Sequence, residues 1–445
     1  MCKAACYLVS FREVPTRVSV CNICNRGTKM VSSNPLPLAG IKVLELTHIV
    51  AGPCAGAILG DLGADVVKVE PPDALQPSRN GYSRQGAYFF LNRNKRGIVL
   101  DLKKPEAVEV FLRLAEDADI VLENQGPGTM DRMGIGYEAI RARNPRIIYC
   151  SVKGFLTGPY SARPLMDELA QAMSGLSYMT GLTGKPLRAG ASITDMGSAM
   201  FCIIGIFAAL RQRDVTGVGQ SITGGLFETA LYFMGPATST AQITGEVPAP
   251  MGDPRSRNFN TLYDMFPCGD GGMVFIAITN DAQWNRFCPA MGLGALLEDT
   301  DLQTTTGRNA NRGKYFPEVE AACMARSVPE IVDALNDANI MVGPLNNPQS
   351  VLTDPHVLSS GRMQYVQIEG NVLLSPNLPI ETSSYTVEHR YDPPEAPGRD
   401  SKEVLAEAGF SAAEIESLLA SGALMDKVAP APPPAAVGAV PAARA

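Results

Sequence analysis

The sequence has few histidines and lacks the short motifs that mark common metal and nucleotide sites. Its three histidines, His48, His356 and His389, lie far apart, and no H-E-x-x-H or G-x-S-x-G stretch occurs. The first strand-like segment runs into THIVAGPCAG, which lacks the G-x-G-x-x-G spacing of dinucleotide sites, and GLTGKP lacks the spacing of a P-loop. These absences disfavour metal catalysis and a histidine-based triad, so we predict no metal site.

The sequence also lacks an excess of positive charge and an apolar run long enough to span a membrane. The formal net charge of -7 argues against the binding of nucleic acid or of an anionic membrane. The uncharged and mostly apolar run 196–210 is shorter than the roughly 20 residues that span a bilayer, which favours a buried helix. No secretory signal is visible, and Cys202 lies in an apolar segment, as a reduced thiol would. We therefore expect a cytoplasmic protein.

The two ends of the chain differ from the rest. Residues 1–36 hold four cysteines without a clear periodicity, and we predict a disordered extension there. The single C-x-x-C pair, Cys21 and Cys24, is a weak sign of a metal or redox site because no matching ligands follow at the usual spacing. Residues 427–445 are rich in proline and alanine, which predicts a disordered tail.

Between these ends, short apolar strands alternate with helices. The segments 41–46, 65–70 and 119–123 have strand character, and KPEAVEVFLRLAEDA before the last of them is an amphipathic helix. This alternation predicts βαβ units, a parallel sheet and an α/β fold. The expected domains are a large Rossmann-like domain at 37–235, a linker and substrate loop at 236–262, a smaller α/β domain at 263–358, and a return segment at 359–426 whose helices pack on the large domain.

Several segments, taken together and in order, resemble the class III CoA-transferases, a family that includes formyl-CoA transferase and dicarboxylate CoA-transferases. They are LAGIKVLELTHIVAGPCAGAILGDLGADVVKVEPP, NRNKRGIVLDLKKPE, ADIVLENQGPGTMDRMGIGYEAI, DELAQAMSGLSYMTG, GKPLRAGASITDMGSAMFCIIGIFAALRQRDVTGVGQ and LAEAGFSAAEIESLLASGAL. The resemblance covers about residues 37–425. It implies an interlocked homodimer with its active site at the domain and subunit interface. CoA thioesters would be substrates, and no cofactor would be bound permanently.

The resemblance also implies a reaction and a nucleophile. In this family, CoA moves from an acyl-CoA to a free carboxylic acid without ATP, through an aspartyl-CoA thioester. Asp195, after GASIT, matches the reactive aspartate. A helix N-terminus suits such a carboxylate because its N–H groups stabilise an anion, although a plain N-cap is the alternative reading. Asp167 matches an acidic position near the substrate, so we expect it to orient the substrate, with a second possibility that it is the nucleophile.

Met166 separates two reactions found on this fold. The resemblance extends to α-methylacyl-CoA racemases, which pair a histidine with an aspartate as two bases. Met166 stands where that histidine would be. Because a methionine cannot accept a proton, a racemase is disfavoured.

The CoA-contacting positions carried over from the family are Val50, Ala51, Leu100, Lys103, Asn124 and Arg132. Lys103 and Arg132 suit the phosphates of CoA, although a solvated surface charge is the alternative. Pro71 stands where formyl-CoA transferase has a basic residue, which leaves Arg79 or Arg96 to serve that end of CoA.

The loop MGDPRSRNFNTLYDMF replaces a run of four glycines in formyl-CoA transferase. Arg255 and Arg257 in this loop suit the second carboxylate of a dicarboxylic acid, although a solvent-facing loop remains the alternative. We therefore expect succinate, malate, mesaconate or citramalate as acids, rather than formate or oxalate.

Two other functions stay open. The first is an intramolecular CoA transfer on an unsaturated C5 dicarboxyl-CoA, which would make the protein an isomerase. The second is a non-catalytic CoA-binding subunit in a hetero-oligomer with a paralogue, against which the presence of Asp195 argues.

Overall fold

A computed structural model describes residues 35–72, 82–253, 262–359, 363–368, 371–387, 389–394 and 396–427, with the backbone alone at 82–85, 367–368 and 371–372. Four groups of sequence predictions lie outside the described residues. They are the substrate arginines Arg255 and Arg257, the alternative phosphate ligand Arg79, the extension at 1–34, and the tail from 428.

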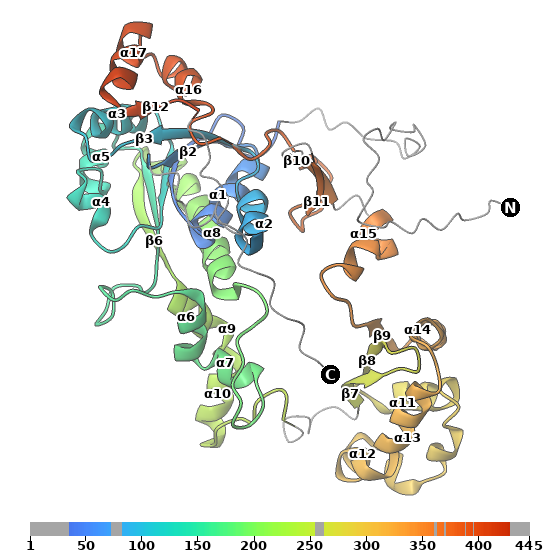
Figure 1. Cartoon of the computed structure of the whole chain (residues 1–445). Helices are drawn as coiled ribbons and strands as arrows, with labels where there is room; N and C mark the ends of the chain where they lie inside the picture. The colour runs from blue at the N-terminus through green and yellow to red at the C-terminus, as the bar shows by residue number, and fades with distance from the viewer. Residues whose placement is uncertain are drawn as a thin grey trace, which may run out of the picture.

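The larger part of the molecule is built on one seven-stranded sheet. Its strands are β1 (Lys42–Leu46), β2 (Asp65–Glu70), β3 (Lys95–Leu100), β4 (Ile120–Glu123), β5 (Ile148–Lys153), β6 (Gln220–Gly225) and β12 (Leu424–Met425). The order is β12-β3-β2-β1-β4-β5-β6, and only β12 runs antiparallel to its neighbour (Figure 1). The predicted α/β fold with a mostly parallel sheet is confirmed. The strand order reverses direction between β1 and β4, where ligands bind in doubly wound sheets.

Helices cover both faces of this sheet. On one face, α1 (Ala51–Asp61) and α8 (Ile193–Thr216) contribute to one core cluster. On the other face, α3 (Pro105–Glu116), α5 (Tyr137–Arg143), α16 (Ser401–Glu407) and α17 (Ala412–Ser421) contribute to a second. α3 begins with Pro105 in its first turn and buries Ala107, Val110, Phe111 and Leu114, a spacing of three and four residues that places them on one side.

The apolar run 196–210 lies within α8. Ala199, Cys202, Ile203, Ile206 and Ala209 pack into the sheet core, as expected for a buried helix. Among the described residues, α8 is the one helix long and apolar enough to cross a membrane by length and composition, and half of its apolar window is buried in this structure.

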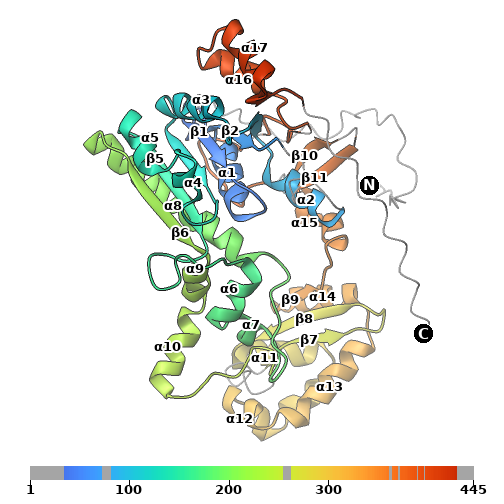
Figure 2. The ribbon, with the colours of Figure 1, turned by 60° about the vertical axis from the view of Figure 1, so that its left-hand side comes forward.

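A smaller unit follows in the chain. An antiparallel sheet of β7 (Leu262–Pro267), β8 (Met273–Ile278) and β9 (Met341–Pro344) packs with α11 (Asp281–Ala290), α12 (Thr305–Ala310), α13 (Arg312–Met324) and α14 (Val328–Asp337) (Figure 2). Its core contains the fully buried rings of Trp284, Phe287 and Tyr315. The chain then returns through α15 (Pro355–Ser359) and the hairpin β10–β11 (Met363–Ile368, Asn371–Pro376).

Four further helices connect these parts: α6 (Asp167–Ser174), α7 (Leu176–Thr180), α9 (Leu226–Phe233) and α10 (Gly235–Thr244). α10 lies in a segment that the sequence predicted as a linker and loop. The helix starts at Gly235–Pro236, and the hydroxyls of Thr240 and Thr244 donate to carbonyl oxygens four residues earlier. Both hydroxyls therefore find acceptors within the helix itself.

Candidate active site

The carboxyl ends of β1, β2 and β3 open into a cavity of about 890 Å³. Its wall includes the sequence-predicted residues Leu100, Lys103 and Arg132. Leu100 ends β3, Lys103 precedes α3, and Arg132 ends the short helix α4 (Thr129–Arg132). Lys103 and Arg132 are exposed, and neither forms an ion pair with a residue that the structure describes. Two cations without ion-pair partners thus stand at the rim of a cavity with a largely apolar wall.

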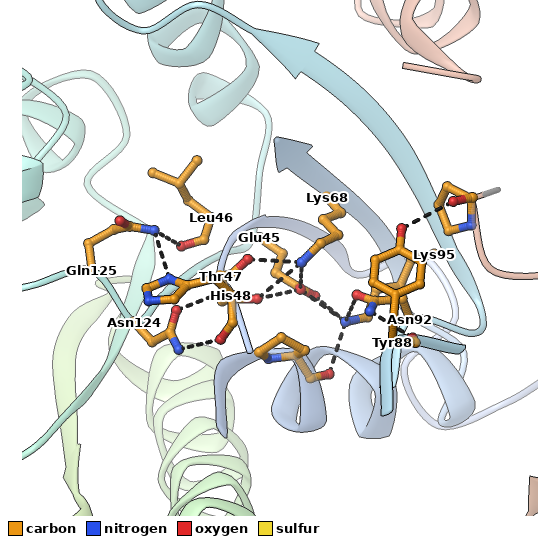
Figure 3. Close-up of polar contacts among 12 residues, drawn as sticks. Glu45, Leu46, Thr47, His48, Lys68, Tyr88, Asn92, Lys95, Asn124 and Gln125 are labelled. Carbon is orange, nitrogen blue, oxygen red and sulfur yellow. Dashed lines mark hydrogen bonds and ion pairs between the residues drawn. The ribbon is translucent and has the colours of Figure 1, made fainter. Parts of the chain in front are cut away.

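The turn between β1 and α1 is clamped by the turn after β4. The side-chain oxygen of Asn124 accepts a hydrogen bond from the His48 backbone N–H, and its NH₂ donates to the His48 carbonyl, both at 2.9 Å (Figure 3). Gln125 donates to the Leu46 carbonyl at 3.0 Å. Ile49 has a φ of 65°, a left-handed conformation that strains a β-branched residue. The two loops at the switch point therefore form one hydrogen-bonded unit.

Three buried charged side chains of the sheet lie next to this turn. Glu45 of β1 lies between Lys68 of β2 and Lys95 of β3, with N–O distances of 3.1 and 2.8 Å, and all three side chains are at most 1% exposed (Figure 3). Lys68 also donates to the Thr47 carbonyl, and Lys95 to the Pro53 carbonyl. The two lysines thus hold both ends of the turn. We call Glu45, Lys68 and Lys95 the buried triad.

The buried triad sits between the sheet and α1. A Cβ atom at Gly56 of α1 would lie 1.8 Å from a Glu45 carboxylate oxygen, so only glycine allows the helix this close. Burial, opposed by Glu45 and reinforced by the charge of Lys68, lowers the pKa of Lys95 to about 8. Burial, together with the charges of Lys68 and Lys153, also lowers the pKa of His48, which lines the cavity, and this favours its neutral imidazole.

Asp195 is the third residue of α8 and not its N-cap, which is Ser192. The cap is supplied from another helix. One carboxylate oxygen of Asp167, on α6, accepts hydrogen bonds from the backbone N–H groups of Thr194 at 2.7 Å and Asp195 at 3.2 Å, and from the Thr194 hydroxyl at 2.6 Å. Asp167 is 6% exposed. Its charge is thereby stabilised by the first turn of α8.

The Asp195 carboxylate itself has no hydrogen-bond or ion-pair partner among the described residues. Burial raises its pKa to about 7, with a further contribution from the negative charges of Asp167 and Glu168. A carboxylate that is partly buried and unpaired is more basic and more nucleophilic than one held in a salt bridge. This environment suits a reactive carboxylate better than a structural one.

The remaining predicted residues form the surroundings of the cavity rather than its wall. Val50 is the N-cap of α1, and Ala51 is its first residue and is 5% exposed. The side-chain amide of Asn124 is hydrogen-bonded to the His48 backbone. Burial, with a smaller contribution from the negative charge of Asp195, raises the pKa of the Cys54 thiol on α1 to about 11, so α1 lies near Asp195.

Arg96 is not available to a ligand in this cavity. It lies at the start of β3, at the opposite end of the strand from the cavity, and pairs with Asp65 and Glu407 at 2.6 Å each. The suggestion that Arg96 replaces the missing basic residue is therefore wrong, because both of its faces are taken by carboxylates. Pro71 does line the cavity, at the position where that basic residue was expected.

Sequence reasoning missed three residues of this region: His48 and Gln125, which line the cavity, and Gln171, which is described below. His48 and Gln125 each come two residues after a predicted strand, and that position is a signal for a ligand site in parallel sheets.

The fold and the site together define an α/β protein with a cavity at its switch point and an unpaired, partly buried carboxylate, Asp195, at the start of α8. A family model described as CoA-transferase family III matches residues 38–401. The chain therefore belongs to CoA-transferase family III and is a CoA-transferase, which confirms the resemblance seen in its sequence.

Two curated relatives and one solved structure support this assignment. The chain is 32% identical to a succinate–glutarate CoA-transferase of Agrobacterium fabrum, over 85% of this chain and 97% of the relative. It is 33% identical to an acetyl-CoA:oxalate CoA-transferase of Acetobacter aceti, over 85% and 97%. A CAIB/BAIF family protein from Brucella suis has the same fold, with a TM-score of 0.77 and 30% identity over 84% of this chain and 100% of that one.

Proposed function

We propose that this enzyme moves CoA from an acyl-CoA such as succinyl-CoA to a free dicarboxylate, such as malate, mesaconate or citramalate, with Asp195 as the covalent nucleophile. The observation that carries this proposal is the Asp195 carboxylate itself: it is unpaired among the described residues, it lies at the start of α8, and its pKa is raised to about 7. The relatives named for succinate, glutarate and oxalate support dicarboxylates as the substrate class.

The chemistry needs no cofactor and no net proton transfer. The Asp195 carboxylate attacks the thioester carbonyl, a C–O bond forms and the C–S bond breaks, which gives a mixed anhydride and CoA thiolate. The thiolate then attacks the Asp195 carbonyl carbon and releases the donor acid, leaving an aspartyl-CoA thioester. The acceptor carboxylate repeats both steps in reverse order.

The experiment that tests this proposal is mass spectrometry of the protein after incubation with succinyl-CoA and trapping with hydroxylamine or borohydride. A modification confined to Asp195 supports the mechanism. No adduct with succinyl-CoA or with a panel of other acyl-CoAs would contradict it. Adding a free acceptor acid then separates transfer from isomerisation, since an isomerase gives a product CoA ester without consuming a free acid.

CoA itself is proposed to lie in the large cavity, with its phosphates at Lys103 and Arg132. Replacing either with alanine should raise KM for succinyl-CoA by roughly 3- to 10-fold and leave kcat unchanged, because the lost contact is the same in the ground and transition states. Initial rates over a range of succinyl-CoA concentrations measure this. Arg141, exposed on α5 and outside the cavity, gives a matched control. An equal rise in the Arg141→Ala variant would contradict the assignment.

We further propose a homodimer whose chains interlock. Large apolar side chains are exposed on α8 and α9, among them Met200, Ile204, Leu231 and Tyr232, which are 43–70% exposed. A soluble monomer rarely leaves such a group uncovered. Light scattering should give twice the chain mass for the wild-type protein and the single-chain mass for Ile204→Glu. A single-chain mass for the wild type would contradict the homodimer, and recovery of a complex with a related chain would favour the hetero-oligomer.

A further inference from the structure

A second, smaller cavity of about 340 Å³ lies at the start of α8, where Ser192, three residues before Asp195, contributes to its wall. It is lined by the start of α6, with Asp167 and Glu168, and by the segment Arg188 to Ser192 that leads into α8. A buried bridge fixes these two walls together. Gln171, fully buried on α6, donates to Asp167 and accepts a hydrogen bond from the Ala189 backbone N–H at 2.8 Å.

Arg188 is the one cation among the described residues that line this cavity. Its partner is Glu168, with an N–O distance of 2.6 Å, and the two side chains are 68% and 50% exposed. An ion pair as exposed as this has little net stability, so an incoming carboxylate can replace Glu168. Glu168 engages one nitrogen of the guanidinium, and no described residue bonds the others. Those free donors form the planar fork that recognises carboxylates.

We propose that Arg188 binds the distal carboxylate of a dicarboxylic acid while the reacting carboxylate faces Asp195. This inference rests on the proposed transferase function and assigns its substrate class to a residue. The negative charge of Asp167 does not oppose this binding, because the Asp167 carboxylate accepts hydrogen bonds from the first turn of α8 and from Gln171. Arg188 and Ser192, which comes three residues before Asp195, both line the cavity, and its volume is large enough for an acid of four or five carbons. A monocarboxylate of equal length lacks the second carboxylate that would bind the guanidinium.

The test compares glutarate with pentanoate, which has the same chain length and one carboxylate fewer. Isothermal titration of each acid into the CoA-loaded protein should show that Arg188→Met weakens glutarate binding by about 10- to 100-fold and leaves pentanoate binding unchanged. Arg188→Lys should recover part of the loss, and Glu168→Gln should tighten glutarate binding because the competing carboxylate is gone. Arg163→Met is the charge-matched control, since Arg163 is exposed and lies outside the cavity.

Three outcomes overturn the proposal: Arg188→Met leaves glutarate binding unchanged, it weakens both acids equally, or the wild type binds glutarate no better than pentanoate. The titration does not depend on catalysis. The absence of an adduct on Asp195 in the wild-type protein therefore refutes the proposed function. The Arg188 site is tested separately, by the binding of the two acids.

Discussion

Asp195→Asn should lower the rate of CoA transfer by at least about 10³-fold, the scale of loss when a covalent nucleophile is removed. The amide is nearly the same size but cannot attack the thioester carbonyl, so the trapped adduct should vanish as well. The assay is the rate of acyl-CoA formation from succinyl-CoA and a free acid, with the adduct followed by mass spectrometry. A variant that retains a tenth of the activity would show that another group, with Asp167 the first candidate, carries the chemistry.

The same prediction has a signature in pH. The nucleophile must be ionised, and burial raises the pKa of Asp195 to about 7, so kcat/KM should fall tenfold per unit below that pH. Asp167→Asn removes a negative charge that helps to raise this pKa, so the acid limb should move to lower pH. An acid limb that stays in place would mean that a different group controls the rate.

Thermal unfolding gives the folding control for Asp195→Asn. The folded state binds more protons at this site than the unfolded state between the ordinary value of 3.8 and about 7, so the wild type loses stability as the pH rises through that window. An asparagine at this position does not ionise, so it does not lose stability in this way as the pH rises. The variant should therefore be at least as stable as the wild type at pH 8, and an inactive variant that is also less stable would not count as support.

Glu45→Ala should destabilise the protein by about 3–5 kcal/mol, because it leaves two lysines buried without their anion. Urea unfolding of the two proteins measures the change. Where the variant still folds, KM for acyl-CoA should rise too, since Lys68 and Lys95 hold the carbonyl groups at both ends of the β1–α1 turn.

Glu416→Ala is the matched control, because Glu416 forms an exposed ion pair with Lys402 at 3.2 Å. This surface pair should contribute less than about 1 kcal/mol. Equal losses for the two variants would show that the buried triad has no special role in the large domain.

Local patterns predicted much of the fold. The alternation of short apolar strands with amphipathic helices is a property of neighbouring residues, and the parallel sheet and the core position of α8 followed from it. The helix α10 was expected as a linker because its composition of threonine, glycine and proline is typical of loops. Its threonines bond their own helix, which composition alone does not reveal.

Side-chain partners across the chain were not predictable in this way. Asp195 was found as a residue before an apolar run, and the resemblance to a family gave it a role. Its environment depends on Asp167, 28 positions earlier, which takes the cap of α8 and leaves the Asp195 carboxylate unpaired. Arg96 looked available as a cation, yet the fold commits it to Asp65 and Glu407.

Residue order along the chain thus specified the α/β class and the family, and it singled out Asp195 as the proposed nucleophile, because periodicity and motifs are local. Tertiary packing alone decided which charges are buried, which are paired and which remain available to a ligand. The physical reason is that desolvation and Coulomb energy depend on distances between atoms, and these distances exist only after the strands and helices have met. The buried triad, the raised pKa of Asp195 and the Arg188 cavity are all of this second kind.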